Sequence, residues 1–315
     1  MINAEQMTKD FEKHQIARNF SASTIETEGR MLMWFFEFLA EETVENITDV
    51  DTTFMLKYQI YLSAIKNNKG KPYNPRTQNL AVSTVRKLFR YLRKKGEVFC
   101  DPTQGMELAK APRPLPRNIL SVKEMNKLLS QPNAKKWVGG RDNSMLEILY
   151  STAMRQGELL HLDLNDLNPD DGTILIRDTK GRRDRVVPCG KEAWRRLKHY
   201  LRTVRPLLVE NINEQAVFLN KYGNRLSKQG LLTLVKTYAL KAGIKKNISA
   251  HNIRHSAATH MADNGCDIRI LQLLLGHSSA NTTAVYLHTS ISKLKLAHQK
   301  FDPREKTAET RTTVA

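Results

Sequence analysis

Cysteine is scarce in this sequence: it has only Cys100, Cys189 and Cys266, and no two of them form a CxxC pair. An odd number of widely spaced cysteines does not make a disulfide framework, and thiolate zinc sites need closely spaced pairs. We therefore expect a protein of a reducing compartment that contains no disulfide bond.

Long apolar runs are also missing, because no stretch approaches the roughly 20 apolar residues that a membrane-spanning helix needs. The most apolar stretch, MLMWFFEFLA from residue 31, contains Glu37 and is better explained as a buried helix. The polar N-terminus, MINAEQMTKD, lacks the basic and then apolar layout of a signal peptide. We expect a cytoplasmic protein with no membrane partner.

Acidic residues are too few to balance the basic ones. The sequence has 32 Asp and Glu against 50 Lys and Arg, a formal net charge of +18 with a pI near 9.8. A protein this basic usually binds a polyanion, most often nucleic acid. A basic surface that binds nothing stays an alternative, since charge alone is weak evidence. The 315 residues suffice for two domains with packed cores.

Helical periodicity dominates the first part of the chain, over residues 7–20, 21–42, 51–68 and 74–96. Ser21 or Ser23 is the expected N-cap of the second helix, and Gly96 the C-cap of the fourth. The predicted buried stripes comprise Met31, Trp34, Phe35 and Phe38 on the second helix, and Leu80, Val85, Leu88 and Leu92 on the fourth.

The rest of the fourth helix is basic, and this face is either an ordinary solvated surface or a DNA phosphate-binding surface. The residues expected to bind DNA here are Arg86, Lys87, Arg90, Arg93 and Lys94.

The helical pattern then ends in a proline-rich stretch. Four prolines between residues 102 and 116 favour an extended linker. Beyond it we expect a capping box of Ser121 and Glu124, a helical pattern over 141–162 that breaks near Thr152, and a β-hairpin over 172–190. A short strand at 216–220 and helices from Ser227 onward complete the pattern.

The sequence thus predicts four regions. They are an all-α N-terminal domain (1–101), a Pro-rich linker (102–119), a mainly α domain with a small β-hairpin or sheet, of α+β class (120–290), and a C-terminal helix with a disordered tail (291–315).

The stretch HNIRHSAATH, residues 251–260, gathers histidines around an arginine. His251 and His255 have the i, i+4 spacing of an HExxH zinc site, but Asn252 stands in place of the glutamate and no convincing third ligand follows. We expect no metal ion and no other cofactor. His260 is expected to be a core histidine, and His255 could be one too, whereas Arg254 in an Ala-rich helix needs an anionic partner.

Five boxes in a fixed order resemble the tyrosine recombinase (phage integrase) family. HNIRH, LLGHSS and NTTAVYLH resemble its C-terminal signature, while LEILYSTAMRQGELLHLDLNDL and DTKGRRDRVVP resemble its upstream boxes. These matches span residues 141–290, and the helical first domain is similar to the family's SAM-like core-binding domain. The departures are mild, because Ile253 for the usual leucine and Ala153 for a common glycine remove no chemical group.

Metal-independent cleavage of a phosphodiester needs a nucleophile, cations for the developing phosphorane and an acid for the leaving oxygen. The resemblance assigns Tyr286 as the nucleophile, Arg155 and Arg254 as phosphate-binding cations, His251 as the general base, Lys180 as the general acid and His277 as a hydrogen-bond donor to phosphate. Glu158 is expected to orient a histidine or arginine, with a plain surface carboxylate as the alternative. The alternative for Lys180 is an ordinary turn lysine. Arg182, Arg183 and Arg185 are expected to contact the DNA backbone.

The resemblance implies a Xer-like, ATP-independent site-specific recombinase. It would cleave and rejoin DNA through a 3′-phosphotyrosine in integration, excision or resolution by way of a Holliday junction. Its partners would be a double-stranded site with inverted repeats and a homo-tetramer, or a hetero-tetramer with a second recombinase, with or without accessory DNA-bending factors. A nucleoid-associated location follows. The alternatives are a type IB topoisomerase-like activity and a non-catalytic DNA-binding architectural protein.

The segment after Tyr286 carries Ile291, Leu294 and Leu296 between lysines. It resembles the family's C-terminal helix, which docks into a neighbouring subunit, and packing on its own domain is an equal alternative.

Overall fold

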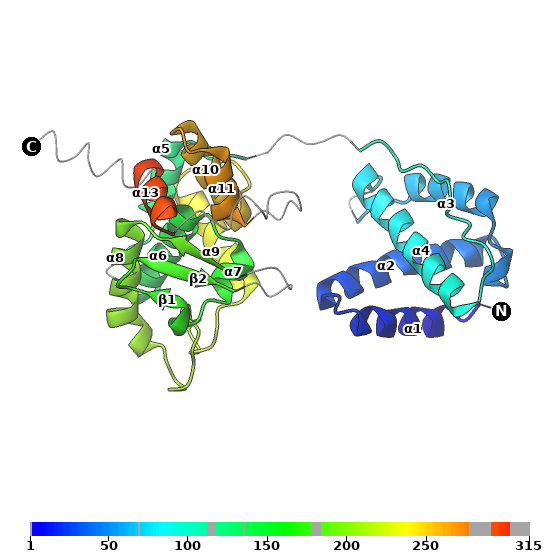
Figure 1. Ribbon diagram of the computed structural model, residues 1–315, viewed down its shortest axis with the longest axis horizontal. Helices are drawn as coiled ribbons and strands as arrows, with labels where there is room; N and C mark the ends of the chain where they lie inside the picture. The colour runs from blue at the N-terminus through cyan, green and yellow to red at the C-terminus, as the bar shows by residue number, and fades with distance from the viewer. Residues whose placement is uncertain are drawn as a thin grey trace, which may run out of the picture. The chain divides into compact units, whose positions relative to one another are not determined.

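The computed structural model describes residues 2–68, 70–111, 118–134, 136–177, 184–276 and 291–302, with side chains from residue 295 in the last range. The chain divides into two compact units, Met1–Pro114 and Leu115–Ala315 (Figure 1). The division falls inside the predicted linker. Each unit is described by itself below.

The described part of the first unit is all-α. Its α-helices are α1 (Ala4–Ala17), α2 (Ala22–Glu41), α3 (Thr52–Ala64) and α4 (Pro75–Lys95), with a short 3-10 turn at Ile47–Asp49. Side chains of Asn3, Ser21, Asp51 and Asn74 accept backbone N–H groups at the four helix starts, so Ser21 rather than Ser23 caps α2. Gly96 ends α4 with φ +77°, as the sequence predicts.

The core of the first unit is aromatic, and the rings of Phe35, Tyr58 and Phe89 meet at edge-on angles. Most of the predicted stripes are buried, but the prediction for Leu80 was wrong. Its side chain is 38% exposed, because Leu80 lies one helical position outside the arc that Val85, Leu88 and Leu92 turn inward.

The first part of the predicted linker packs onto the first unit. The Met106 side chain is buried, and its carbonyl oxygen accepts a hydrogen bond from Arg86 Nη2 at 3.0 Å. Gln59 donates to the Glu107 carbonyl, and Asn79 exchanges two hydrogen bonds with Ala109. Proline content therefore identified the extended backbone but not these side-chain contacts.

The second unit is built around α6 (Trp137–Thr152), whose residues from Gly139 to Thr152 are all buried. The helices described around it are α5 (Val122–Leu129), α7 (Gln156–Leu160), α8 (Lys191–His199), α9 (Lys228–Lys241), α10 (Ala250–Asp263), α11 (Ile268–Leu275) and α13 (Ile291–Phe301). Short 3-10 or π turns lie at Leu164–Asp166, Tyr200–Val204 and Arg205–Leu207. The predicted capping box of Ser121 and Glu124 is present at α5.

The described strands form a small antiparallel sheet in the order β1 (Leu167–Asn168), β2 (Thr173–Ile176) and β3 (Arg185–Pro188) (Figure 1). The predicted hairpin pairs Thr173 with Pro188 and Ile176 with Arg185. The predicted strand at 216–220 was wrong, since Ala216 and Leu219 make isolated bridges alone. That apolar run is buried core, and a short buried run gives no period that distinguishes a strand from a loop.

Helix α13 lies against β3 and α11 of its own unit. His298 is buried and contacts the Ser151 carbonyl at 2.7 Å, while Asp302 accepts from the Ser151 hydroxyl at 3.0 Å. Leu296 is 68% exposed. None of the helices in the described ranges is long and apolar enough to cross a membrane. The predicted tail from residue 304 lies outside the described residues.

Candidate active site

The break after α6 places Arg155. Ala153 ends α6 with φ +50°, a left-handed conformation that turns the chain sharply before α7. Arg155 then precedes the first residue of α7, and its backbone N–H donates to Glu158 Oε2 at 2.6 Å. Its guanidinium donates to Glu158 Oε1 at 2.8 Å and to the Gly276 carbonyl at 3.1 Å.

Arg254 enters the same place from α10. Its side chain is only 6% exposed, and its guanidinium donates to the Ala153 carbonyl at 2.8 Å and to the Leu275 carbonyl at 2.7 Å. Glu158 lies 3.9 Å away, so the anionic partner that this arginine needs comes from another helix. The left-handed turn at Ala153 thus positions Arg155 along the chain and supplies an acceptor for Arg254.

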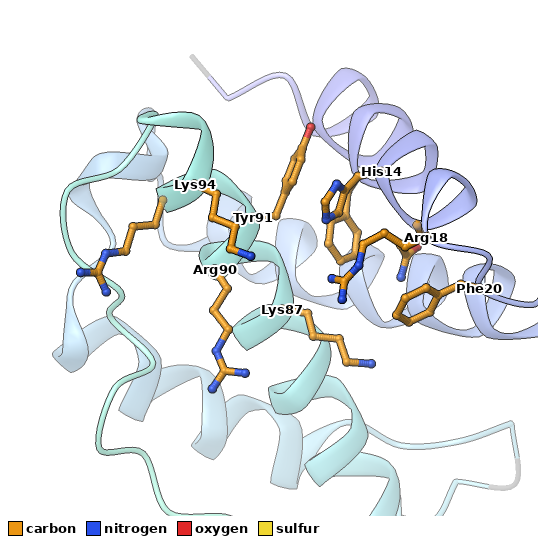
Figure 2. A pocket seen from close by; sticks show the side chains of 10 residues that line it. His14, Arg18, Phe20, Lys87, Arg90, Tyr91 and Lys94 are labelled. Carbon is orange, nitrogen blue, oxygen red and sulfur yellow. The ribbon is translucent and has the colours of Figure 1, made fainter.

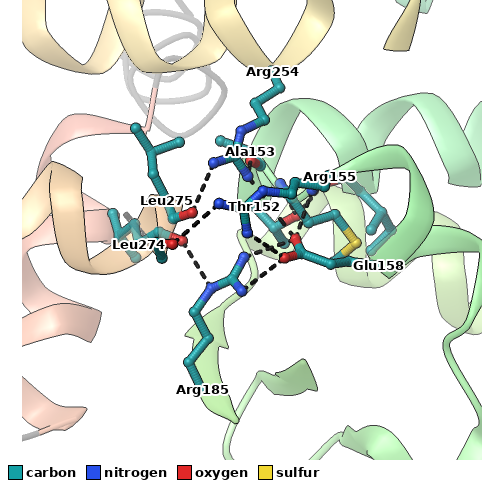
Figure 3. Close-up of polar contacts among 11 residues, drawn as sticks. Thr152, Ala153, Arg155, Glu158, Arg185, Arg254, Leu274 and Leu275 are labelled. Carbon is teal, nitrogen blue, oxygen red and sulfur yellow. Dashed lines mark hydrogen bonds and ion pairs between the residues drawn. The ribbon is translucent and has the colours of Figure 1, made fainter. Parts of the chain in front are cut away.

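Glu158 is the carboxylate at the centre of this cluster (Figure 3). It accepts from Arg155 and also from both terminal nitrogens of Arg185, at 2.9 and 2.8 Å. Burial raises the pKa of Glu158, but hydrogen bonds from Arg185 and from Arg155 outweigh burial, and its pKa is about 2. Glu158 is therefore ionised throughout the physiological range.

The C-terminal end of α11 binds all three arginines. The carbonyl groups of Leu274, Leu275 and Gly276 accept, in that order, from Arg185 at 3.3 Å, Arg254 at 2.7 Å and Arg155 at 3.1 Å. The last carbonyl groups of a helix have no partner within the helix and carry partial negative charge, so they favour cations. Helix α11 therefore fixes the positions of three guanidinium groups that come from distant parts of the chain.

The arginines outnumber the carboxylate, which makes this a site for an anion. Burial lowers the pKa of Arg254 to about 10, and repulsion from Arg155 acts in the same direction. Arg254 still carries its charge at neutral pH. Burial and repulsion from Arg155 destabilise that charge, and a bound anion would offset both effects. Planar guanidinium groups suit the oxygen atoms of a phosphate.

His251 lies three residues before Arg254 on α10 and is exposed. Its Nε2 is 2.9 Å from Nε2 of His255, which is also exposed. Partial burial, followed by the nearby His255, Arg254 and Arg155, lowers the pKa of His251 below its ordinary value of 6.5. His251 is therefore neutral and able to accept a proton at neutral pH.

His260 is a core histidine, as predicted. It is 6% exposed, its Nδ1 lies 2.9 Å from the Tyr150 hydroxyl, and its Nε2 lies 2.8 Å from the Leu120 carbonyl. His255 is not buried, contrary to the packing alternative. Within the described ranges, no three His, Cys, Asp or Glu side chains gather as metal ligands.

Several of the predicted site residues lie outside the described residues. They are Lys180, Arg182, Arg183, His277 and Tyr286. The described strands β2 and β3 lie on either side of the lysine hairpin in the chain, and Gly276 directly precedes His277.

The predicted DNA-binding residues of α4 divide into two groups. Arg86 is partly buried and bonded to Met106, and Lys87 is ion-paired with the buried Glu28. Arg90, Arg93 and Lys94 are exposed. A cavity of about 630 Å³ opens beside them, between α1 and α4, with His14, Arg18 and the rings of Phe20 and Tyr91 on its wall (Figure 2).

Arg185 has a different position from the one predicted for it. Sequence reasoning placed it with the DNA backbone contacts, but its side chain is 15% exposed and bonded to Glu158. The hairpin register explains this position, because Arg185 pairs with Ile176, which is buried. Residues opposite each other in an antiparallel pair share a face, so the side chain of Arg185 points to the core side.

The chain matches two family models. The phage integrase family matches residues 118–293, and the N-terminal SAM-like domain of phage integrases matches residues 9–96. Tyrosine recombinase XerC 2 of Ralstonia nicotianae is 34% identical over 300 residues, covering 94% of this chain and 86% of that protein. Tyrosine recombinase XerD of Staphylococcus epidermidis is 34% identical over 290 residues, covering 92% of this chain and 96% of that protein.

Solved structures share the fold. The XerH site-specific recombinase bound to its difH substrate before cleavage has a TM-score of 0.66 at 24% identity, covering 91% of this chain and 82% of that one. The Tn1549 transposon integrase in complex with circular intermediate DNA has a TM-score of 0.68 at 17% identity, covering 94% and 99%. The chain belongs to the phage integrase family of tyrosine recombinases, enzymes of site-specific recombination that catalyse DNA cleavage and strand exchange.

Proposed function

We propose that Arg155 and Arg254 bind the scissile phosphate and that Tyr286 attacks it. The observation that supports this most is the convergence of the two guanidinium groups on the end of α11, at 3.1 and 2.7 Å from consecutive carbonyl groups. Two fixed cations match the charge that grows on the non-bridging oxygens as the phosphorane forms. Cations already in place need little rearrangement when that charge appears.

The proton transfers follow from the remaining groups. The Tyr286 hydroxyl oxygen forms a bond to phosphorus as the bond from phosphorus to the 5′ oxygen breaks. His251, neutral because of its lowered pKa, takes the phenolic proton, and Lys180 protonates the departing 5′ oxygen. His277 donates a hydrogen bond to the phosphate. Reversal of these steps by a 5′ hydroxyl reseals the strand, so the enzyme conserves bond energy without ATP.

The exposed cations of α4 are proposed to contact the DNA backbone. Arg90, Arg93 and Lys94 lie on one helix and line the cavity together with Arg18 and His14. Binding through phosphates releases counterions, so affinity falls steeply with salt. Arg90→Gln is expected to reduce the slope of log affinity against log salt by about one. Lys9→Gln, which removes an exposed lysine paired with Glu5 on α1, serves as the control and should leave the slope unchanged.

The assembly is proposed to be a tetramer on two synapsed sites with inverted repeats, either of this chain alone or together with a second recombinase. Accessory DNA-bending factors and a nucleoid location belong to the same proposal. Helix α13 packs against β3 and α11 of its own unit, so a role for it between subunits would require it to leave these contacts.

Covalent trapping tests the proposal. The protein is incubated with a library of nicked duplexes in a chelating buffer, and a denaturant-resistant protein–DNA adduct is collected. An adduct is expected from the natural chain and from Tyr222→Phe, which alters an exposed tyrosine of the same unit. Binding without an adduct would favour an architectural protein, and relaxation of supercoiled DNA by a monomer would favour the topoisomerase alternative.

A further inference from the structure

We propose that Arg185 is a positioning residue of the recombination site, which holds Glu158 and the end of α11 in place, and that it does not contact the DNA backbone. This inference rests on the proposed function of Arg155 and Arg254. It assigns Arg185 a task that none of the expected catalytic residues performs.

The first contact is with the central carboxylate. Arg185 begins β3, and both of its terminal nitrogens donate to Glu158, at 2.9 Å to Oε1 and 2.8 Å to Oε2. The side chains are 15% and 12% exposed, so solvent weakens this pair less than it weakens a surface pair. The fork geometry also fixes the plane of the carboxylate, whose Oε1 accepts from Arg155 at 2.8 Å.

The second contact is with the end of α11. Arg185 Nε donates to the Leu274 carbonyl at 3.3 Å, and its guanidinium covers Gly276, where a Cβ atom would lie 2.9 Å from the guanidinium carbon. Gly276 has φ +61°, which also favours glycine. Arg185 thus fills the space that a side chain at position 276 would occupy.

These contacts join two chain segments that carry proposed catalytic groups. Lys180 lies five residues before Arg185 in the sequence, and His277 directly follows Gly276. Neither residue is described, but each segment is anchored at a described end by the same guanidinium group.

The contacts of Arg185 also determine how close Glu158 lies to the other two arginines. The carboxylate lies 2.8 Å from Arg155 and 3.9 Å from Arg254. Without Arg185, two of its hydrogen bonds would be lost, and the carboxylate would be drawn toward the remaining arginines. A carboxylate closer to Arg254 would compete with the phosphate for that cation. The expected defect is therefore in the rate of cleavage and not in the affinity for DNA.

A double-mutant cycle with Arg185→Gln and Glu158→Gln tests this. Single-turnover cleavage is measured at saturating DNA on the trapped substrate, beside the affinity for DNA over a range of salt. We expect Arg185→Gln to slow cleavage about 10- to 100-fold, with affinity and salt slope unchanged. The loss in the double variant should be smaller than the product of the two single losses, because Arg185 and Glu158 share one interaction, while the contact of Arg185 with Leu274 adds a further part. Arg185→Lys, which retains the charge but not the planar fork, should recover part of the rate.

Arg177→Gln is the matched control, since Arg177 follows β2 of the same hairpin and pairs with Asp166 at 2.6 Å rather than with Glu158. It should leave cleavage unchanged. A salt slope lowered by about one in Arg185→Gln would show a phosphate contact and overturn the proposal. Additive effects on cleavage would overturn it too. If the natural chain forms no adduct, the proposed function fails. The coupling of Arg185 to Glu158 is still tested in that case, by measuring the thermal stability of the same single and double variants.

Discussion

The guanidinium groups of Arg155 and Arg254 donate to two consecutive carbonyl groups, Gly276 at 3.1 Å and Leu275 at 2.7 Å. Arg155 precedes α7 and Arg254 lies within α10, so the two cations come from separate elements. The end of α11 therefore determines the spacing between them. Both cations are therefore already in place for a phosphate that bridges them.

Replacing Arg254 by lysine should slow single-turnover cleavage by about 100- to 1,000-fold. Lysine retains the charge but cannot reach both the Ala153 and Leu275 carbonyl groups with a planar fork. Affinity for DNA should change only a few-fold. Arg205→Lys is the control, because Arg205 also donates to backbone carbonyl groups, those of Glu214 and Ala216. Equal loss of cleavage in the two variants would contradict a role in binding the scissile phosphate.

The cleavage rate should rise with pH through a midpoint below 6.5, because His251 accepts a proton only when neutral and its pKa is lowered. Nearby His255 contributes to that lowering after burial, so His255→Ala should move the midpoint upward. His199→Ala, at an exposed histidine of α8, should leave the profile unchanged. The rate is measured against pH for the natural chain and the two variants. A midpoint that His255→Ala leaves unchanged would contradict the effect of His255 on the pKa of His251.

Glu158→Gln should lower the free energy of unfolding at pH 7 by about 3 kcal/mol, because three buried or half-buried arginines lose their shared anion. The pKa of Glu158 is lowered to about 2 from an ordinary 4.5, so its contribution is present above pH 4.5 and is lost as pH falls through 2. Urea unfolding at several pH values should therefore show the difference narrowing below pH 4.5. Glu192→Gln, at a more exposed carboxylate that pairs with two arginines of α8, should cost less than about 1 kcal/mol.

Ala153→Gly should stabilise the protein by up to about 1 kcal/mol, because Ala153 has φ +50° and glycine adopts that conformation without strain. The gain is reduced by the greater freedom of glycine in the unfolded chain. Ala239→Gly, inside α9, should instead destabilise by about 1 kcal/mol. Denaturant unfolding distinguishes the two. Destabilisation by Ala153→Gly would mean that the turn bears no strain.

The sequence predicted the helical elements well, because their apolar residues recur with the helical period and their ends carry recognisable caps such as Ser21, Asn74 and Gly96. The order of motifs also predicted that Arg155 and Arg254 lie in one site, but not that Arg185 joins them. Glu158 lies one turn after Arg155, so its contact with that arginine was predictable from local spacing.

The role of Arg185 could not be predicted in the same way. Its contacts reach Glu158 and Leu274, which lie 27 and 89 residues away in the chain. No local pattern encodes such contacts, and a basic hairpin in a basic protein first suggests DNA. The strand predicted at 216–220 was wrong because the apolar character of a short segment does not determine whether it pairs as a strand.

Identification of the residue that carries the DNA tests the central claim most directly. The adduct is digested with nuclease and protease, and the peptide that retains a nucleotide is sequenced by mass spectrometry. We predict a 3′-linked nucleotide on Tyr286, and no adduct from Tyr286→Phe. A nucleotide on any other side chain, or an adduct of equal yield from Tyr286→Phe, would contradict it.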